Sequence, residues 1–230
     1  MSIQHLKGIA LRRYSFFTMQ GPPFAIKNGD ICVPVILKMF EIFQKYISEK
    51  VSLSNEEYQL ISSVCIYKKL RKRQYLLQEG DTWKYNAFVC KGCVRNYRVS
   101  ENGDEHIISF APENWWTGDR EALLTGNPAK SNIDALEDTL VLLIAKDHFE
   151  DICARIPAFY NMITGILNKS FIASQNRIHS AISFTAEQKY LSFLERYHEL
   201  ALRIPQHMIA SYLGITPETL SRVKKESVRK

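Results

Sequence analysis

Four side chains close to the C-terminus, Glu218, Ser221, Arg222 and Lys225, combine the types and the spacing needed to contact duplex DNA. Residues three and four positions apart share one face of a helix, so these four would stand side by side. The Arg222 guanidinium can donate to O6 and N7 of guanine, and the Glu218 carboxylate can accept from N4 of cytosine. Ser221 can reach a base or a phosphate, while Lys225 and its neighbour Lys224 suit phosphates. We therefore predict a DNA-recognition helix here.

The residues before this helix predict the turn that would present it. Counted from Gln206, the small residue Ala210 takes the fifth place, where two helices can cross closely. Gly214 takes the ninth place, where the turn needs a positive φ. Thr216 is placed as the N-cap and Pro217 as the first helical residue. The apolar residues expected to lock the two helices together are Ile209, Leu213, Leu220 and Val223. This pattern favours a helix-turn-helix over an ordinary helical hairpin with a solvated charged face.

The charge distribution agrees with an anionic partner at this end of the chain. The 230 residues carry a formal net charge of +6, and residues 201–230 hold six Lys and Arg against two Glu. A basic segment beside a more acidic body favours a nucleic acid, although ordinary soluble proteins also carry basic tails. With 46% hydrophobic residues, the chain is long and apolar enough for one large or two modest domains.

The elements that must position this helix precede it in three groups. Residues 40–64 show two short helical patterns, and Ser54 stands three residues before Glu57 as in a capping box. Residues 67–144 show short apolar runs separated by turn signals such as QEGD, SENGDE and TGNP, which is typical of an antiparallel barrel or sandwich. Helical spacing returns over residues 159–181 and again over 186–200. We expect an α+β fold.

Two segments carry a family resemblance. IPQHMIASYLGITPETLSRVKKE resembles the DNA-binding end of the Crp/Fnr family of bacterial transcription regulators, and ETLSR matches the E-x-x-S-R pattern of its Fnr branch. The segment that begins YLLQEGDTWKYNAFVCKGC is similar to the cyclic-nucleotide-binding jelly roll of that family. Its glycines at the barrel turns are Gly80, Gly92, Gly103 and Gly118. The resemblance covers about Phe40 to Lys225 and implies an N-terminal antiparallel β jelly roll, a long dimerisation helix and a C-terminal winged helix-turn-helix.

The resemblance also implies a function and a domain order. We expect a DNA-binding transcription regulator that is a cytoplasmic homodimer and a partner of RNA polymerase. The expected divisions are an extension at residues 1–38, an effector-sensing β-barrel at 39–157, a linker and dimerisation helix at 158–182 and a helix-turn-helix domain at 183–230. The expected DNA-binding residues are Thr216, Glu218, Thr219, Ser221, Arg222, Lys224 and Lys225. The expected dimer-helix residues are Phe159, Met162, Ile163, Ile166 and Leu167.

The sequence departs from the family at two places near the recognition helix. The cyclic-AMP receptor branch has an arginine just before the recognition glutamate, and this chain has Pro217 there. The sequence also ends within about five residues of the helix, so we do not expect the usual β-hairpin wing after it.

The effector site departs from the cyclic-nucleotide pattern as well. The Gly-Glu pair of nucleotide-binding members is replaced by Gly118 and Asp119, and the Arg-Ser pair falls near Ala129, Lys130 and Ser131. Lysine supplies a point charge but not the bidentate fork of arginine, so we expect an effector other than cyclic AMP. The expected effector pocket consists of Gly118, Asp119, Lys130, Ser131 and Ser174. We expect no defined cofactor, only an unidentified small-molecule effector.

Metal-dependent and enzymatic functions are disfavoured by the pattern of ligating residues. Of the cysteines at 32, 65, 90, 93 and 153, only the CKGC pair has ligand spacing, and it lacks the second Cys/His pair of a zinc site. CKGC is therefore expected to be a tight turn between strands. The histidines at 5, 106, 148, 179, 198 and 207 are scattered, with no His-x-His as in jelly-roll metalloenzymes, so we predict that the chain is not an enzyme.

The N-terminal segment suggests neither a membrane span nor a secretory signal. Its longest apolar run, ICVPVIL, contains a proline and is far shorter than the roughly 20 residues a span requires. Because residues 1–38 lack periodicity and Met39 opens the readable structure, these residues are expected to be either a mobile extension or an upstream misreading of the start.

Two alternatives to an effector-controlled regulator stay open at this point. One is an effector-independent regulator whose barrel is a scaffold or a docking surface. The other is an effector-binding protein whose wingless C-terminus has lost specific DNA binding.

Overall fold

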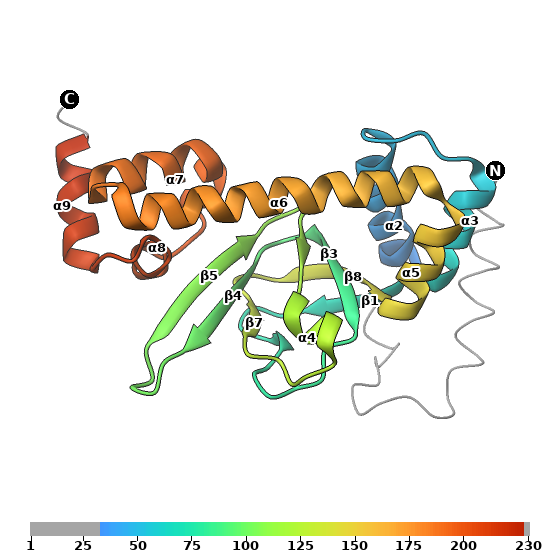
Figure 1. Cartoon of the computed structure of the whole chain (residues 1–230), viewed down its shortest axis with the longest axis horizontal. Helices are drawn as coiled ribbons and strands as arrows, with labels where there is room; N and C mark the ends of the chain where they lie inside the picture. The colour runs from blue at the N-terminus through green and yellow to red at the C-terminus, as the bar shows by residue number, and fades with distance from the viewer. Residues whose placement is uncertain (1–32, 228–230) are drawn as a thin grey trace.

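A computed structural model describes residues 33–227 of the chain as antiparallel β-sheets placed between two groups of helices (Figure 1). This arrangement confirms the predicted α+β class. The helices before and after the sheets are α2 (Val33–Ser48), α3 (Asn55–Val64), α5 (Lys146–Arg155), α6 (Pro157–Ser183), α7 (Ala186–Ala201), α8 (Gln206–Leu213) and α9 (Pro217–Ser227), and the short α4 (Arg120–Thr125) lies within the strand region.

The strands form two four-stranded sheets in which the paired strands are antiparallel. The first sheet has the order β1-β8-β3-β6 and the second has the order β2-β7-β4-β5. The strands are β1 (Ile66–Leu70), β2 (Tyr75–Leu77), β3 (Tyr85–Lys91), β4 (Val94–Val99), β5 (Glu105–Ala111), β6 (Trp116–Thr117), β7 (Asn132–Ala135) and β8 (Thr139–Ala145). Successive strands alternate between the two sheets, except for β4 and β5, which pair within the second sheet, and such crossing between two sheets is typical of a jelly roll.

Apolar side chains gather in three clusters. The first fills the space between the two sheets and includes Val89, Val94 and Ile133. The second lies between the first sheet and the helices α2, α3, α5 and α6. The third joins the second sheet to helices α7, α8 and α9, with Tyr97 of β4 and Phe193 of α7 among its buried members. The barrel is therefore covered by helices at both ends.

The N-terminal helix packs firmly on the first sheet. Met39, Phe43 and Ile47 are fully buried, and the Phe43 ring lies 4.9 Å from the Phe88 ring of β3, centroid to centroid. Helix α2 begins at Val33, which is earlier than the Met39 boundary expected from the sequence. Residues 1–32 of the predicted extension lie outside the described residues.

The capping box predicted for α3 is confirmed. The Ser54 hydroxyl accepts from the Glu57 N–H at 3.2 Å, and the Ser54 N–H donates to the Glu57 carboxylate at 2.6 Å. No helix within residues 33–227 combines the length and apolar character needed to cross a membrane.

The CKGC segment forms the expected turn, between β3 and β4. Gly92 has φ of +89°, and a Cβ there would lie 2.5 Å from the Thr139 hydroxyl, so only glycine fits. Cys90 and Cys93 are buried, and that burial raises the pKa of each thiol to about 12. Such thiols stay protonated and are poor metal ligands, and residues 33–227 hold no group of three metal-ligating side chains.

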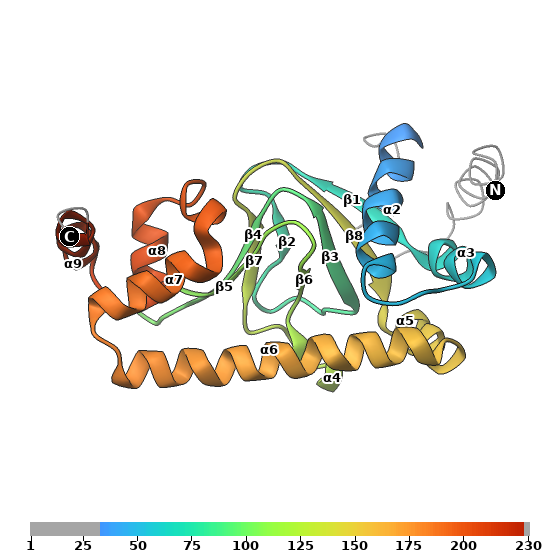
Figure 2. The same cartoon turned by 90° about the horizontal axis from the view of Figure 1, so that it is seen from above.

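Helix α6 is the longest of the described helices and connects the two helical groups (Figure 2). Its first turns pack in the second cluster, and its last turns run beside the C-terminal helices. The chain then continues into α7 through a capping box in which the Thr185 hydroxyl accepts from the Gln188 N–H. This arrangement places α9 at the far end of the molecule from α2 (Figure 1).

Candidate nucleic-acid interface and effector cradle

Helices α8 and α9 meet at a tight corner around Gly214. This residue has φ of +64° and ψ of 38°, the left-handed conformation that the spacing predicted. Its N–H reaches the Ser211 carbonyl at 3.1 Å, and the Ile215 N–H reaches the Ala210 carbonyl at 3.1 Å. The carbonyls at the end of α8 are thereby satisfied while the chain reverses direction.

The side chains predicted to lock the corner are buried. Each is at most 9% exposed, and all belong to the third cluster. They are Ile209, Ala210, Leu213, Leu220 and Val223. The spacing counted from Gln206 therefore describes a real packing interface between α8 and α9.

The start of α9 is shaped by threonines. The Thr216 hydroxyl accepts from the Thr219 N–H at 3.2 Å and lies 3.1 Å from the Thr219 hydroxyl. The pKa of the exposed Glu218 is lowered by hydrogen bonds from its own backbone N–H and from the Thr216 side chain. Glu218 is therefore ionised at neutral pH and can only accept hydrogen bonds.

The outward face of α9 brings together most of the predicted DNA-binding residues. Pro217, Glu218, Ser221, Arg222 and Lys225 line a shallow hollow of about 510 Å³. Within residues 33–227, neither Arg222 nor Lys225 forms an ion pair with a carboxylate, so both charges are available. The face thus offers an acceptor, a hydroxyl, a guanidinium and an ammonium on one helix.

Lys224 departs from that face. Its side chain is half-buried, and its Nζ donates to the Gln206 amide oxygen of α8 at 2.9 Å. Thr216 and Thr219 likewise use their hydroxyls within the protein. These three residues support helix α9 more than they extend its outer surface.

The expected effector cradle is closed on itself. Asp119 is buried, and its two carboxylate oxygens accept from the Ala122 N–H at 3.0 Å and the Lys130 N–H at 3.1 Å. Asp119 is the N-cap of α4. The Lys130 ammonium pairs with Glu121, and Ser131 is buried. The carboxylate that would receive a ribose hydroxyl is therefore occupied by backbone donors.

Trp83 fills the space next to this loop. A Cβ at Gly118, whose φ is +149°, would lie 2.8 Å from the Trp83 Nε1, so the indole packs directly on the glycine. Trp83 is only 5% exposed, and its Nε1 has no hydrogen-bond partner within the described residues. The sequence predicted a pocket of Gly118, Asp119, Lys130, Ser131 and Ser174 and did not predict Trp83, which no motif marks.

Ser174 lies outside the cradle contacts. Its hydroxyl donates to the Ser170 carbonyl of the same helix at 3.0 Å, and its side chain is exposed on α6. The structure therefore joins the other cradle residues in one loop region and leaves Ser174 on the long helix.

Two of the residues expected on the dimer face of α6 are buried within their own chain instead. Phe159 is fully buried and Ile163 is 8% exposed, both in the second cluster of their own chain. Met162, Ile166 and Leu167 are partly buried and pack against the same cluster. The periodicity had identified an apolar face correctly, but this part of it faces the chain's own core. The exposed apolar residues of α6 are Tyr160, Phe171, Ile172, Ile178 and Ile182.

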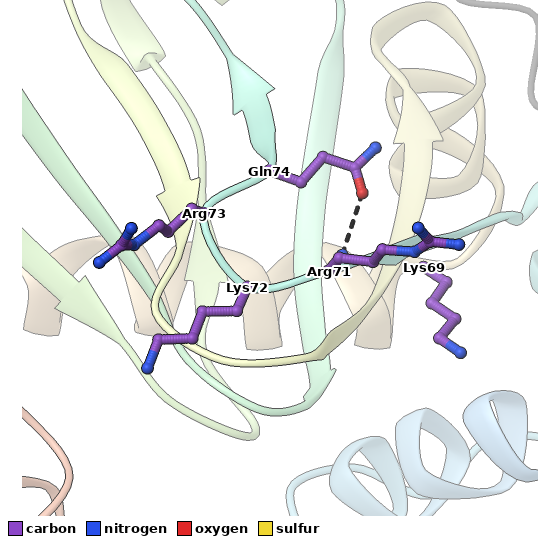
Figure 3. Close-up of a pocket in the computed structure, with 5 residues that line it drawn as sticks. All are labelled: Lys69, Arg71, Lys72, Arg73 and Gln74. Carbon is purple, nitrogen blue, oxygen red and sulfur yellow. Dashed lines mark hydrogen bonds between the residues drawn. The ribbon is translucent and has the colours of Figure 1, made fainter.

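A basic turn between β1 and β2 forms a second exposed charged surface (Figure 3). Its residues Lys69, Arg71, Lys72, Arg73 and Gln74 line an open pocket of about 450 Å³. The backbone N–H groups of the turn are already used, since those of Arg71, Lys72 and Arg73 donate to other protein groups. An anionic partner would therefore meet side chains only. The run KKLRKR at residues 68–73 marks this surface in the sequence.

The comparisons with known proteins match this architecture. The family described as the cyclic nucleotide-binding domain matches residues 67–156. The chain is 27% identical over 190 residues to the regulatory protein HlyX of Actinobacillus pleuropneumoniae, covering 75% of this chain and 76% of that protein.

Two solved structures share the fold. FixK2 from Bradyrhizobium japonicum superposes with a TM-score of 0.64 at 21% identity, covering 72% of this chain and 85% of that one. A transcriptional regulator of the Crp/Fnr family from Eubacterium rectale superposes with a TM-score of 0.58 at 19% identity, covering 77% and 85%. The names of the Actinobacillus and Eubacterium proteins describe regulators rather than enzymes, in agreement with the sequence-based prediction. With the exposed Glu218, Ser221 and Arg222 of α9, these matches show that the chain is similar, over most of its length, to DNA-binding transcription regulators of the Crp/Fnr type.

Proposed function

We propose that each protomer reads an operator half-site with the outward face of α9. The observation that carries this proposal is the shared exposure of Glu218, Ser221 and Arg222 on one side of a helix held at a tight corner. Arg222 then donates two hydrogen bonds to a guanine, and Glu218 accepts one from a cytosine, while Ser221 contacts a base or a phosphate. Lys225 contacts phosphates and sets affinity rather than sequence preference.

We propose that two protomers pair along an exposed seam of α6. Tyr160, Thr164, Leu167, Phe171, Ser174, Ile178 and Ala181 follow one another at alternating steps of four and three. Such a repeat brings one face of a helix against its twin in a coiled-coil packing. Phe171 and Ile178 are 64% and 55% exposed in the single chain, so a partner helix would bury them. A parallel pair would carry the two α9 helices toward half-sites about one DNA turn apart, roughly 34 Å.

The division of labour follows the order of the chain. We assign effector sensing to the barrel of residues 39–157, coupling and pairing to the helix of residues 158–182, and DNA reading to residues 183–230. Because its target is the bacterial chromosome, we place the protein in the cytoplasm.

We propose that the effector is not cyclic AMP. Two observations support this: Asp119 is already bonded to two backbone N–H groups, and Trp83 packs where Gly118 leaves room. The fold accommodates other signals, since it is shared by CLP, a c-di-GMP-responsive global regulator of Xanthomonas campestris. That structure superposes with a TM-score of 0.63 at 11% identity over 76% of this chain and 92% of that one. A barrel that binds no effector and serves only as a scaffold is the second candidate, and the filled interior between the sheets favours it.

We propose that RNA polymerase contacts the protein at the basic turn of residues 69–74. Four cationic side chains stand there without carboxylate partners among residues 33–227. The turn belongs to the barrel, at a distance in the fold from the α9 end (Figure 1). An acidic surface of a protein bound beside the operator would complement it.

Replacing the guanine-reading side chain should remove sequence preference. The wild-type protein is first used to select its preferred duplex from a random pool. Arg222→Ala should bind that selected duplex roughly 10- to 100-fold more weakly than the wild type, because a bidentate arginine–base contact contributes about 1–3 kcal/mol. Its affinity for random DNA should be unchanged. The measurement is a fluorescence-anisotropy titration. Lys225→Ala is the matched control, which should weaken binding to both duplexes equally and flatten the salt dependence. Equal affinity of wild type and Arg222→Ala for every duplex would contradict specific reading by α9.

Placing charge in the α6 seam should dissociate the dimer. Phe171→Asp and Ile178→Asp each bury a carboxylate in the paired helices, which is unfavourable without a partner cation. Light scattering after gel filtration should then give a molar mass near 26.6 kDa instead of twice that value. Ile172→Asp changes an equally apolar, exposed residue one step around the helix and should leave the dimer intact. If Ile172→Asp dissociates the protein and Ile178→Asp does not, the seam is misplaced.

Cyclic AMP should not stabilise the protein. A ligand that binds only the folded state raises the melting temperature by an amount that grows with its concentration over Kd. Because the cradle offers no arginine fork and no free Asp119 oxygen, the melting temperature with saturating cyclic AMP should equal that with AMP at the same concentration. A rise of several degrees with the cyclic nucleotide alone would overturn the assignment.

Neutralising the basic turn should change transcription without changing DNA affinity. With Arg71→Gln and Lys72→Gln combined, the effect of the protein on transcript yield in vitro should fall several-fold at equal operator occupancy. Lys38→Gln with Lys45→Gln removes two exposed cations of α2 and is the matched control. Unchanged transcript yield, or a loss explained by lower occupancy, would exclude this turn as the polymerase contact.

A further inference from the structure

Arg203, which lies between α7 and α8, contacts two turns of the barrel directly and a third through one of its carboxylate partners. Its guanidinium donates to the two carboxylate oxygens of Glu113 at 3.0 and 2.9 Å. It also pairs with Glu137, and Glu113 in turn accepts from the Gly92 N–H at 2.8 Å. Glu113 follows β5, Glu137 precedes β8 and Gly92 separates β3 from β4. This set of residues, the Arg203 socket, therefore connects the CKGC turn to the recognition domain.

The socket carboxylate is ionised in the folded protein. Burial raises the pKa of Glu113, but the hydrogen bonds from Arg203 and Gly92 outweigh that effect and the net pKa is lowered. Both side chains are about one-third exposed, so the ion pair by itself contributes little to folding stability. Its geometry is more informative than its energy, since a two-pronged arginine–carboxylate contact fixes orientation as well as distance.

A second set of contacts holds α8 on the edge of the same sheet. The Ile107 N–H of β5 donates to the Ser211 hydroxyl at 3.1 Å, and that hydroxyl donates to the Glu105 carbonyl at 2.8 Å. From α6, Arg177 donates to the carbonyls of Ile107 at 2.9 Å and Tyr212 at 3.1 Å. The first helix of the corner is thus attached to β5 through the backbone of both elements.

Aromatic packing completes this attachment. The rings of Phe110 of β5 and Tyr212 of α8 lie 5.5 Å apart, and those of Trp115 and Tyr197 lie 5.7 Å apart. These side chains belong to the third cluster, which is continuous from the barrel to α9. The C-terminal helices are therefore docked on the sensing sheet rather than merely tethered to it.

The docked arrangement leaves the recognition face open. Glu218, Ser221, Arg222 and Lys225 line a solvent-facing hollow, while the docking contacts use α7, α8 and the loop at Arg203. Docking and DNA binding hence do not compete for the same side chains. A docked α9 has a fixed direction, and a rigid binding element loses less conformational freedom on association.

We propose that Arg203 is a positioning residue, which through Glu113, Glu137 and Gly92 holds the recognition helices at the angle required to meet two half-sites together. This inference rests on the proposed reading of DNA by α9. Loss of the Arg203 socket leaves the DNA-contacting side chains of α9 unchanged but allows the orientation of α9 relative to the barrel to vary. Affinity is then lost for an operator that both α9 helices of a dimer must bind together, and not for a single half-site that one α9 helix binds alone.

The test compares a two-half-site operator with a duplex that carries a single half-site, both taken from the wild-type selection. Arg203→Ala should bind the complete operator about tenfold more weakly and the single half-site as the wild type does. It should also discriminate less than the wild type against operators with one or two base pairs inserted between the half-sites. Arg203→Lys, which keeps the charge without the fork, should fall between the two. Glu113→Gln should reproduce the Arg203→Ala effect, and the double variant should be no weaker than either single variant.

Arg155→Ala is the matched control, because it breaks an exposed ion pair with Asp151 that joins no two domains, and it should bind both duplexes normally. Dimer mass and melting temperature of all variants are measured alongside. Hydrogen exchange at the Gly92 and Ile107 amides gives a readout independent of DNA, and both amides should exchange faster in Arg203→Ala.

Several outcomes separate this inference from the function on which it rests. A wild-type protein that selects no sequence overturns the proposed function, and unchanged exchange at Gly92 and Ile107 in Arg203→Ala then overturns the socket as well. A wild type that selects an operator, with Arg203→Ala equally tight on it, overturns the positioning role alone. An equal loss on the complete operator and on the single half-site also overturns it, since that result would show general damage to α9.

Discussion

The edge of strand β5 requires partners, and that requirement joins the two halves of this protein. An edge strand presents N–H and C=O groups that have no neighbour in the sheet. Here those groups at Glu105, Ile107 and Ile108 are paired by Ser211 of α8 and Arg177 of α6. Because both partners come from outside the barrel, the sheet expected to sense a signal is also the surface that supports the helices proposed to read DNA.

The parts of the fold that the sequence predicted are those encoded over short distances. The corner at Gly214 was predictable because its spacing, its positive φ and the Thr216 cap lie within a dozen residues of one another. The Ser54–Glu57 capping box and the CKGC turn were predictable for the same reason. The two sheets followed from turn signals between short apolar runs, since such runs close on themselves only as antiparallel strands.

The parts that could not be predicted depend on contacts between distant residues. A helical stripe shows that Phe159 and Ile163 are buried, but its period is the same whether the partner is the chain's own barrel or a second helix. Asp119 matched a motif position, yet only the fold reveals that Ala122 and Lys130 already use its oxygens. Arg203 and Glu113 are 90 residues apart, so no local pattern connects them.

Helix α6 and the Arg203 socket define how a change in the barrel can reach the recognition helix. The first turns of α6 pack against the barrel at Phe159. Near the end of α6, Arg177 donates a hydrogen bond to the Ile107 carbonyl of β5, and the next residue, Ile178, lies exposed on the proposed dimer seam. A shift of β5 would therefore act on the helix at the place where it would meet its twin. The Arg203 socket contacts the chain at the other end of the same strand, because Glu113 lies two residues beyond the end of β5. Two contacts on one strand resist rotation of the docked helices better than either does alone, so in the proposed function a signal that moved β5 would change the direction of α9 as well as its distance from the barrel.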